Sequence, residues 1–279
     1  MIEFLAFFLL HLAATRSDML VSTAWLAGHL NDSNLVVLHV ARERSSYEAG
    51  HIPGARFLPL GELAVTRDGV PSELPPPADL RALFERVGVS DDTRVILYGD
   101  NLGLAATRAW FTLDYLGHGD RAALLDGGLE QWRAEQRAVF TETPEFKPGR
   151  FTPQLRRQVV ASLETVRNLA PEVLLLDARP ASAYSNGHIP GAVNLFWMED
   201  LVNKDNPVLR APDQLRRIYE TAGAAPGRKV ITSCQVGMTA SHLYFALKYL
   251  GYDTAMFNGS FSQWSQTPGA PIATGPNPK

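Results

Sequence analysis

The feature that most constrains the fold is an internal repeat, because a short segment beginning at Tyr47 recurs at Tyr184. Both copies read Tyr-x-x-Gly-His-Ile-Pro-Gly-Ala, and both follow an apolar run. Three further pairs match in the same order: runs ending at Asp100 and Cys234, helical patterns ending in Tyr-Leu-Gly, and segments 126–132 and 258–264. Four ordered matches indicate a duplicated domain of about 120 residues.

Each copy alternates short apolar runs with helical patterns. The runs at 35–38 and 173–176 are typical of buried strands, and the patterns at 105–116 and 239–250 predict crossover helices. This alternation predicts an α/β fold of two tandem domains, each a parallel sheet flanked by helices. We expect the first, non-catalytic domain over residues 19–140, a proline-rich linker over 141–157 and the second, catalytic domain over 158–271.

Residues 1–18 are expected to form a signal or a disordered leader. The apolar run from Phe4 to Leu12 is too short to span a bilayer as a helix, so no stable membrane span is predicted. It resembles the apolar part of a secretory signal, although Glu3 stands where a positive charge is typical. Export to the periplasm and residence in the cytoplasm therefore both stay open. The net charge of −3 argues against a nucleic-acid partner.

The chain has one cysteine, Cys234, which excludes an internal disulfide and a cysteine-based metal site. It follows the strand-like run at 230–231 and precedes the helical pattern that begins at Thr239. Ligands bind at the carboxyl ends of strands in open α/β sheets. Loop N–H groups and a helix N-terminus favour a negatively charged sulfur. The placement therefore favours a reactive thiol over the alternative, an inert buried side chain.

The residues that follow the cysteine are expected to form a loop around its sulfur. They are Gln235, Val236, Gly237, Met238 and Thr239. Gly237 lets the backbone curl, and Thr239 can cap the helix or donate a hydrogen bond to a bound anion. The matching place in the first copy holds Asp100, which cannot be a sulfur nucleophile, so only the second domain is predicted to be catalytic.

The ordered motifs resemble the tandem rhodanese family over residues 20–270. They are the two Gly-His-Ile-Pro-Gly-Ala segments, the loop Cys-Gln-Val-Gly-Met-Thr and the ending Gly-Ser-Phe-Ser-Gln-Trp. The resemblance implies a sulfurtransferase of the thiosulfate sulfurtransferase type. Cys234 would accept a sulfane sulfur as a persulfide and pass it to cyanide or a thiol, with residues 235–239 as its cradle. This chemistry needs no metal or organic cofactor, and we expect none.

The sulfur donor is predicted to be a small anion, thiosulfate, with 3-mercaptopyruvate as the alternative. Family members specific for thiosulfate often carry basic loop residues, and mercaptopyruvate members often carry Cys-Gly-Ser/Ala-Gly-Val-Thr; this loop matches neither. Mercaptopyruvate members also place an arginine where this chain has Ala183, which weakens that alternative. Arg179 is a candidate anion contact, although an ion pair with Asp177 is the simpler interpretation.

Two other functional classes are weaker predictions. A cysteine-dependent phosphatase needs an arginine that closes the loop and clamps the oxyanion, and no arginine stands there. A non-catalytic sulfur-sensing module is disfavoured by the intact cysteine loop. His51 and His188 occur in both copies while the cysteine occurs in one, so we predict a structural role for them. The repeated Trp132 and Trp264 are likewise predicted to pack in the core.

Overall fold

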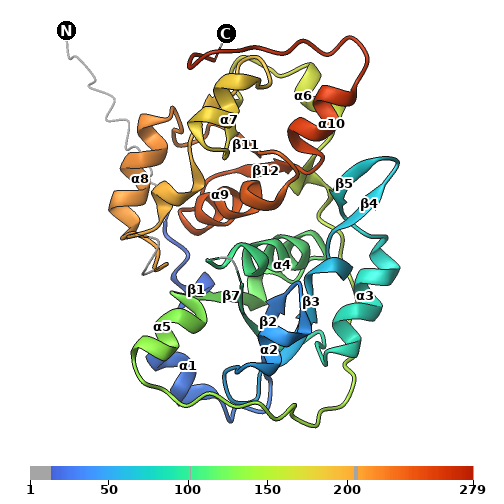
Figure 1. The fold of residues 1–279 in the computed structure, drawn as a ribbon, viewed down its shortest axis with the longest axis vertical. Helices are drawn as coiled ribbons and strands as arrows, with labels where there is room; N and C mark the ends of the chain where they lie inside the picture. Colours follow the sequence, from blue (N-terminus) through green and yellow to red (C-terminus); the bar gives the residue numbers. More distant parts are fainter. Residues whose placement is uncertain (1–13, 101, 204–206, 279) are drawn as a thin grey trace, which may run out of the picture.

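A computed structural model describes residues 14–100, 102–203 and 207–278 of the chain. The chain folds into two α/β domains, which lie one above the other in Figure 1. Each domain is built on a five-stranded sheet in which all neighbouring strands are parallel. The predicted fold class is therefore confirmed.

The first sheet has the strand order β1-β7-β6-β2-β3. Its strands are β1 (Leu20–Val21), β2 (Leu35–Ala41), β3 (Arg56–Pro59), β6 (Arg94–Gly99) and β7 (Ala122–Leu125). The helices of this domain are α1 (Thr23–His29), α2 (Arg44–Glu48), α3 (Pro77–Arg86), α4 (Leu104–Tyr115) and α5 (Gly128–Ala134). Short 3-10 turns lie at η1 (Ser17–Met19), η2 (Leu60–Glu62) and η3 (Gly119–Arg121).

The second sheet repeats this order, because β8-β12-β11-β9-β10 corresponds strand for strand to the first sheet. Its strands are β8 (Val160–Ala161), β9 (Leu174–Asp177), β10 (Val193–Asn194), β11 (Val230–Ser233) and β12 (Thr254–Phe257). The helices are α6 (Leu163–Arg167), α7 (Ala181–Asn186), α8 (Pro212–Thr221), α9 (Met238–Tyr249) and α10 (Ser260–Gln266). The 3-10 turns are η4 (Arg157–Val159) and η5 (Trp197–Asp200).

The repeated Gly-His-Ile-Pro-Gly motif forms the same buried turn in both domains. His51 stacks on Tyr47 with ring centroids 3.8 Å apart, and its Nδ1 lies 2.9 Å from the Tyr47 carbonyl oxygen. His188 stacks on Tyr184 at the same 3.8 Å, with Nδ1 3.0 Å from the Tyr184 carbonyl. These ring and backbone contacts fit the structural role predicted for both histidines.

The repeated tryptophans also occupy matching places in the two domains. Trp132 on α5 and Trp264 on α10 are buried in the core. Each indole N–H donates to a backbone carbonyl, Trp132 to Ala138 at 2.8 Å and Trp264 to Pro271 at 2.7 Å. Both side chains therefore anchor the last helix of their domain, as expected of a core residue.

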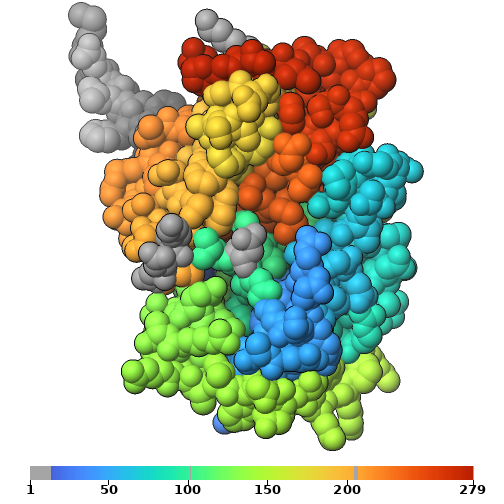
Figure 2. Space-filling view, viewed as in Figure 1, coloured from blue at the N-terminus to red at the C-terminus, as the bar shows by residue number. Residues whose placement is uncertain are grey.

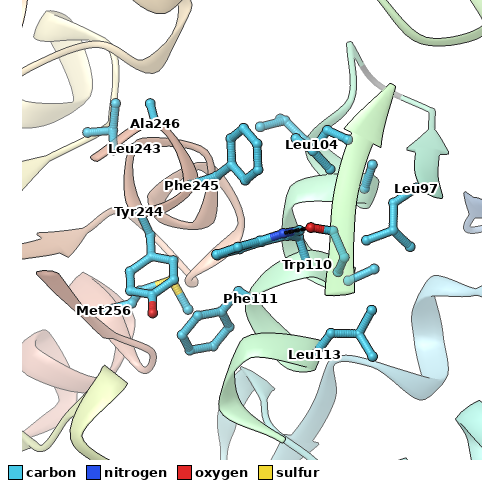
Figure 3. Packing of buried hydrophobic residues seen from close by; sticks show 14 of the residues in the cluster. Leu97, Leu104, Trp110, Phe111, Leu113, Leu243, Tyr244, Phe245, Ala246 and Met256 are labelled. Carbon is cyan, nitrogen blue, oxygen red and sulfur yellow. Dashed lines mark hydrogen bonds between the residues drawn. The ribbon is translucent and has the colours of Figure 1, made fainter. Parts of the chain in front are cut away.

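The two domains meet through their crossover helices, α4 and α9. Trp110 packs edge-on against Phe245, and Phe111 packs edge-on against Tyr244, each with centroids 5.1 Å apart and an interplanar angle of 84° (Figure 3). These two pairs are equivalent when the domains are exchanged. The helices are thus related by an approximate two-fold axis, which joins both domains in one apolar core.

The segments that lead into the two domains are held in an equivalent way. Arg156, at the end of the linker, donates its backbone N–H to the Tyr115 carbonyl at the end of α4. Arg16 donates in the same way to the Tyr249 carbonyl at the end of α9, and both bonds are 2.8 Å long. Arg16 therefore packs on the second domain, although it falls within the predicted leader. Residues 1–13, the larger part of that leader, lie outside the described residues.

A two-stranded antiparallel hairpin, formed by β4 (Val65–Arg67) and β5 (Val70–Glu73), leaves the first domain. Asp68 and Gly69 turn it with φ of 52° and 78°, and two positive φ values are typical of a tight hairpin turn. The Ser72 carbonyl accepts a 3.2 Å bond from the Asn258 amide of the second domain. In Figure 2 the cyan hairpin lies against the orange and red surface of that domain.

In the part of the chain that the structure describes, no helix is both long and apolar enough to cross a membrane.

Candidate active site

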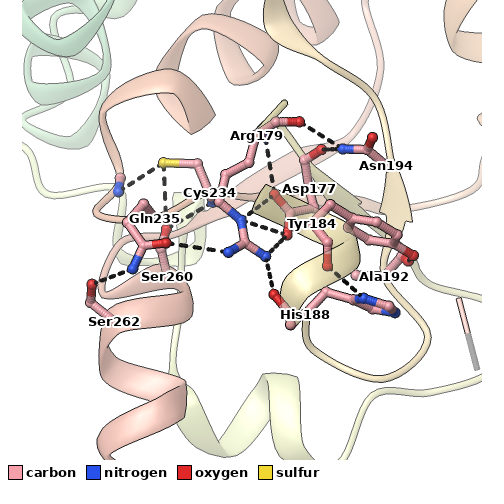
Figure 4. A network of polar contacts seen from close by, with 12 residues as sticks. Asp177, Arg179, Tyr184, His188, Ala192, Asn194, Cys234, Gln235, Ser260 and Ser262 are labelled. Carbon is pink, nitrogen blue, oxygen red and sulfur yellow. Dashed lines mark hydrogen bonds and ion pairs between the residues drawn. The ribbon is translucent and has the colours of Figure 1, made fainter. Parts of the chain in front are cut away.

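Cys234 lies between strand β11 and helix α9, and its side chain is 1% exposed. The backbone N–H of Gly237 donates to its Sγ at 3.1 Å. The Cys234 backbone N–H donates to the Ser260 hydroxyl, also at 3.1 Å, and this hydroxyl lies 4.0 Å from Sγ (Figure 4). The sulfur therefore sits at the N-terminus of a twelve-residue helix, where the N–H of Gly237 donates to it and negative charge is favoured.

The tight loop depends on Gly237, which has a φ of +80° and is the N-cap of α9. A Cβ at this position would stand 2.6 Å from the backbone oxygen of Asn258. Only glycine fits here without a shift of the backbone. The expectation that Thr239 caps the helix is wrong, because α9 starts at Met238 and has no side-chain cap. Thr239 stands two positions after the N-cap, inside the first turn.

The other predicted loop residues surround the sulfur to different degrees. Val236 and Met238 are half-buried, and Gln235 is exposed. The Gln235 amide donates to the Ser262 hydroxyl at 3.1 Å, and its Oε1 accepts a 3.2 Å bond from Arg179. Gln235 thus links the loop to helix α10 and to the end of strand β9.

Arg179 is bound as a structural side chain. Its Nη2 lies 2.6 Å from Asp177 Oδ2 in a buried ion pair, and it also donates to the Gly187 carbonyl at 2.8 Å. Its guanidinium stands over the Phe261 ring, 4.3 Å from the centroid. The simpler interpretation, an ion pair with Asp177, is therefore the observed geometry, and Arg179 reaches the loop only through Gln235.

The first-domain loop holds a different group of polar side chains. Asp100 stands three residues before the N-cap Gly103, as Cys234 does before Gly237. Its Oδ1 accepts a 2.7 Å bond from the Ser46 hydroxyl and lies 3.2 Å from His39 Nε2. Burial lowers the pKa of His39, partly offset by Asp100. The described part of this loop offers no thiol.

Two side chains near the sulfur were not anticipated. Ser260 comes from the segment after β12, and Arg108 reaches the loop from α4 of the first domain. The repeat of segment 126–132 at 258–264 could have marked the position of Ser260, but it gives no sign of its contact with Cys234. Arg108 lies inside an apolar helical pattern with no local signal, so only the packing of the two domains reveals it.

Comparisons with known proteins agree with this geometry. The family model for the rhodanese-like domain matches twice, at residues 22–135 and 162–267. The sulfur carrier protein TtuD of Thermus thermophilus is 33% identical over 92% of this chain and 97% of its own length. A probable 3-mercaptopyruvate sulfurtransferase of Pseudomonas aeruginosa is 34% identical over 93% of this chain and 99% of its own length. Other similar proteins are named thiosulfate sulfurtransferases.

A solved structure supports the same assignment. SseA from Escherichia coli, described with the rhodanese fold and the mechanism of 3-mercaptopyruvate sulfotransferases, superposes with a TM-score of 0.79. It is 27% identical, and the match covers 87% of this chain and 98% of that one. With two matching domains, relatives of equal length and a single cysteine in the active loop, the chain belongs to the rhodanese family of sulfurtransferases.

Proposed function

We propose that the chain moves a sulfane sulfur from thiosulfate to cyanide or a thiol through a persulfide on Cys234. The observation that carries this proposal is the 3.1 Å bond from the Gly237 N–H to Sγ at the N-terminus of α9. A donor aimed at the sulfur stabilises a thiolate, and it can stabilise the anionic persulfide in the same place.

The reaction proceeds by two displacements at sulfur. The Cys234 thiolate attacks the outer sulfur of thiosulfate, the S–S bond breaks and sulfite leaves with the electron pair. Cysteine then carries the outer sulfur as a persulfide anion. Cyanide attacks that sulfur, thiocyanate leaves, and the thiolate is restored. Each step forms one bond and breaks one, as in other covalent catalysis by cysteine.

The polar environment supports thiosulfate as the donor. The guanidinium nearest the loop on the β9 side, Arg179, is engaged by Asp177, and Ala183 offers no further charge. A carboxylate donor such as mercaptopyruvate would gain most from a free guanidinium. Thiosulfate can instead be held through its terminal oxygens by N–H groups and the exposed Gln235 amide.

The second candidate donor is 3-mercaptopyruvate, favoured by the relatives with that name. The similarity to a protein named a sulfur carrier also supports a thiol as acceptor. Steady-state assays with each donor, at matched cyanide concentration, separate the two candidates. A kcat/KM at least tenfold higher with mercaptopyruvate would replace thiosulfate by this second donor.

Intact-protein mass spectrometry tests the proposal directly. After incubation with thiosulfate and removal of the donor, we expect a mass gain of one sulfur atom, which cyanide or dithiothreitol removes. Cys234→Ser should show no gain, and it keeps the size of the side chain. Because the chain has a single cysteine, the added sulfur can be assigned without peptide mapping. No gain with either donor, from protein that iodoacetamide still alkylates, would overturn the persulfide.

A further inference from the structure

Arg108, in the middle of helix α4, is a fully buried charge that the proposed reaction does not yet use. Its side chain is 0% exposed. Burial lowers its pKa to about 10, so the guanidinium keeps its proton at neutral pH. A buried cation without a compensating charge is strongly destabilising, so its presence in the core calls for an anion nearby.

The direct partners of Arg108 are neutral. Nη1 donates to Asn258 Oδ1 at 2.6 Å, and Nη2 donates to the Ser72 carbonyl of the hairpin at 2.7 Å. Nε has no hydrogen-bond partner. Among the residues that the structure describes, no carboxylate forms an ion pair with this guanidinium. The positive charge of Arg108 is therefore not neutralised by its hydrogen-bond partners.

The cysteine loop lies directly beside this guanidinium. Nη1 is 3.3 Å from the point where a Cβ on Gly237 would stand, and the N–H of Gly237 binds the sulfur of Cys234. Burial is the main cause of the lowered pKa of Arg108, and the nearby Glu73 on strand β5 and Cys234 act in the opposite direction. Glu73 forms an ion pair with Arg67 across the hairpin. Among the described residues, the hydrogen-bond partners of the Cys234 sulfur are neutral, the Gly237 N–H and the Ser260 hydroxyl.

The two-fold relation of the domains explains how a first-domain residue reaches this loop. The helices touch at Thr107 and Ser241, whose hydroxyl oxygens are 3.1 Å apart and which hold the same place in the two repeats. Arg108, the residue after Thr107, reaches the cysteine loop of the opposite domain. Its counterpart His242 instead lies against Asp200 and Trp197 of its own domain, and it lines a cavity with Gly103 of the first-domain loop.

We propose that Arg108 of the first domain is the positioning cation of the second domain's sulfur site, and that it stabilises Cys234 as thiolate and as persulfide. It acts across Gly237 and keeps Asn258 in place. This inference rests on the proposed function, since a sulfur that never carries negative charge would need no cation. The first domain then supplies part of the active site, although it has no cysteine.

A test of this proposal must separate the effect of Arg108 on the sulfur from the effects of the other charged groups near the loop. From the first domain, Arg108 lies beside the loop at Gly237, and Glu73 interacts with Arg108. From the second domain, Arg179 reaches the loop through Gln235 and is neutralised by Asp177. Removing Arg108 alone should therefore shift the balance of charge at the sulfur toward the negative side and disfavour the thiolate.

The experiment measures the rate of iodoacetamide alkylation against pH in the full-length protein. In Arg108→Gln we expect the midpoint of the rate profile to move up by about one pH unit, equal to about tenfold less thiolate at a given pH. Arg108→Lys should restore most of this shift because it keeps the charge. His242→Gln is the matched control, because it changes the equivalent side chain on the other helix, and its midpoint should equal that of the wild type.

A folded Arg108→Gln with the wild-type midpoint would overturn the proposal, and so would an equal shift in His242→Gln. If Arg108→Gln fails to fold, Arg108→Met keeps the apolar stem without the charge and takes its place in the comparison. Alkylation needs no sulfur donor, so its outcome is separate from that of the persulfide experiment. A wild type that forms no persulfide refutes the proposed function, whereas unchanged midpoints refute only the role of Arg108.

Discussion

At the scale of single residues, one hydroxyl holds the sulfur loop to the rest of the second domain. Ser260 accepts a bond from the backbone N–H of Cys234, donates to the Phe257 carbonyl at 2.9 Å, and lies 4.0 Å from Sγ. It has a φ of +51°, a conformation that only a few non-glycine residues adopt. Strain of this kind persists when surrounding contacts compensate for it, and here these contacts tie the cysteine loop to the end of strand β12.

Ser260→Ala should therefore weaken both stability and sulfur transfer. The buried N–H of Cys234 would lose its partner, which costs about 1–3 kcal/mol of unfolding free energy. Without this hydrogen bond the loop is less well fixed, and sulfur transfer should slow about tenfold. This factor corresponds to a rise of about 1.4 kcal/mol in the activation barrier, similar to the energy of one hydrogen bond. Ser265→Ala, on the exposed side of the same helix, is the control and should change neither. Urea unfolding and initial-rate assays measure the two effects, and equal behaviour of both variants would contradict this role.

The reactive residue is predictable from sequence, but the surroundings that tune it are not. Cys234 is singled out by a local pattern of strand, turn and helix, and Gly237 by the tight turn that follows. Ser260 and Arg108 are far from this loop in the chain, and they reach it because β12 and α4 pack beside it. Such contacts depend on how the domains are stacked, which a local pattern does not contain. Of the two roles expected for Thr239, capping is wrong because the helix is capped at Gly237, two positions earlier, while a hydrogen bond to a bound anion stays a prediction.

At the scale of elements, the two crossover helices offer an internal comparison. Helix α4 begins after Gly103 with φ +82°, and α9 begins after Gly237 with φ +80°. Among the described residues, a Cβ on Gly103 would meet nothing within 4 Å, whereas one on Gly237 would stand 2.6 Å from the Asn258 backbone oxygen. The same turn is therefore open in the first domain and closely packed in the second, which holds the sulfur.

Substituting alanine at each glycine should separate conformational cost from packing cost. Gly103→Ala should lose about 1–2 kcal/mol, the penalty for a left-handed non-glycine residue. Gly237→Ala should lose about 2–4 kcal/mol, because the close contact adds the cost of overpacking. It should also displace the N–H that binds the sulfur and slow alkylation of Cys234. Chemical denaturation of both variants checks the order, and a larger loss in Gly103→Ala would contradict it.

The crossover helices were predicted from their apolar patterns, whereas the β4–β5 hairpin was missed. The predicted crossover helices at 105–116 and 239–250 differ by one residue from α4 and α9. The β4–β5 hairpin was not predicted, because its strands are short and polar and bury little of their surface in the first domain. Its turn, Asp68-Gly69, is nevertheless a recognised hairpin signal, and it could have located this element.

At the scale of the whole molecule, each domain sends a segment onto the other. The hairpin contacts the second domain through Ser72. In return, Leu209 of the second domain contacts Asp126 of the first. Asp126, at the end of β7, accepts a 2.9 Å bond from the Leu209 backbone N–H. Burial raises the pKa of Asp126 to about 6, although bonds from the backbone of Leu209 and Gly127 oppose the shift.

This shift predicts a pH dependence of stability with a definite sign. The folded protein binds the Asp126 proton more tightly than the unfolded chain, so stability falls as pH rises from about 4 to about 6. Asp126→Asn removes this fall and still offers an oxygen to Leu209. At pH 7 the variant should be more stable by about 3 kcal/mol.

Thermal unfolding between pH 4 and 7 measures the difference between Asp126→Asn and the wild type. The exposed Asp32→Asn serves as the control, and its difference from the wild type should not vary in this way. A difference for Asp126→Asn that stays constant with pH would show that this carboxyl does not carry the shift.

The way in which the linker lies on the protein limits how substrates can enter. A Cβ on Gly149 would stand within 1.9 Å of the Val89 carbonyl oxygen, and the backbone N–H of Arg156 is bound at the end of α4. The linker is thus part of the packed body and cannot serve as a hinge that swings the domains apart. The hairpin adds a further tie, because its Ser72 carbonyl binds Arg108 and Asn258 beside the cysteine loop. Access to a thiol that is 1% exposed therefore depends on local movement of side chains and short segments, and not on separation of the two domains.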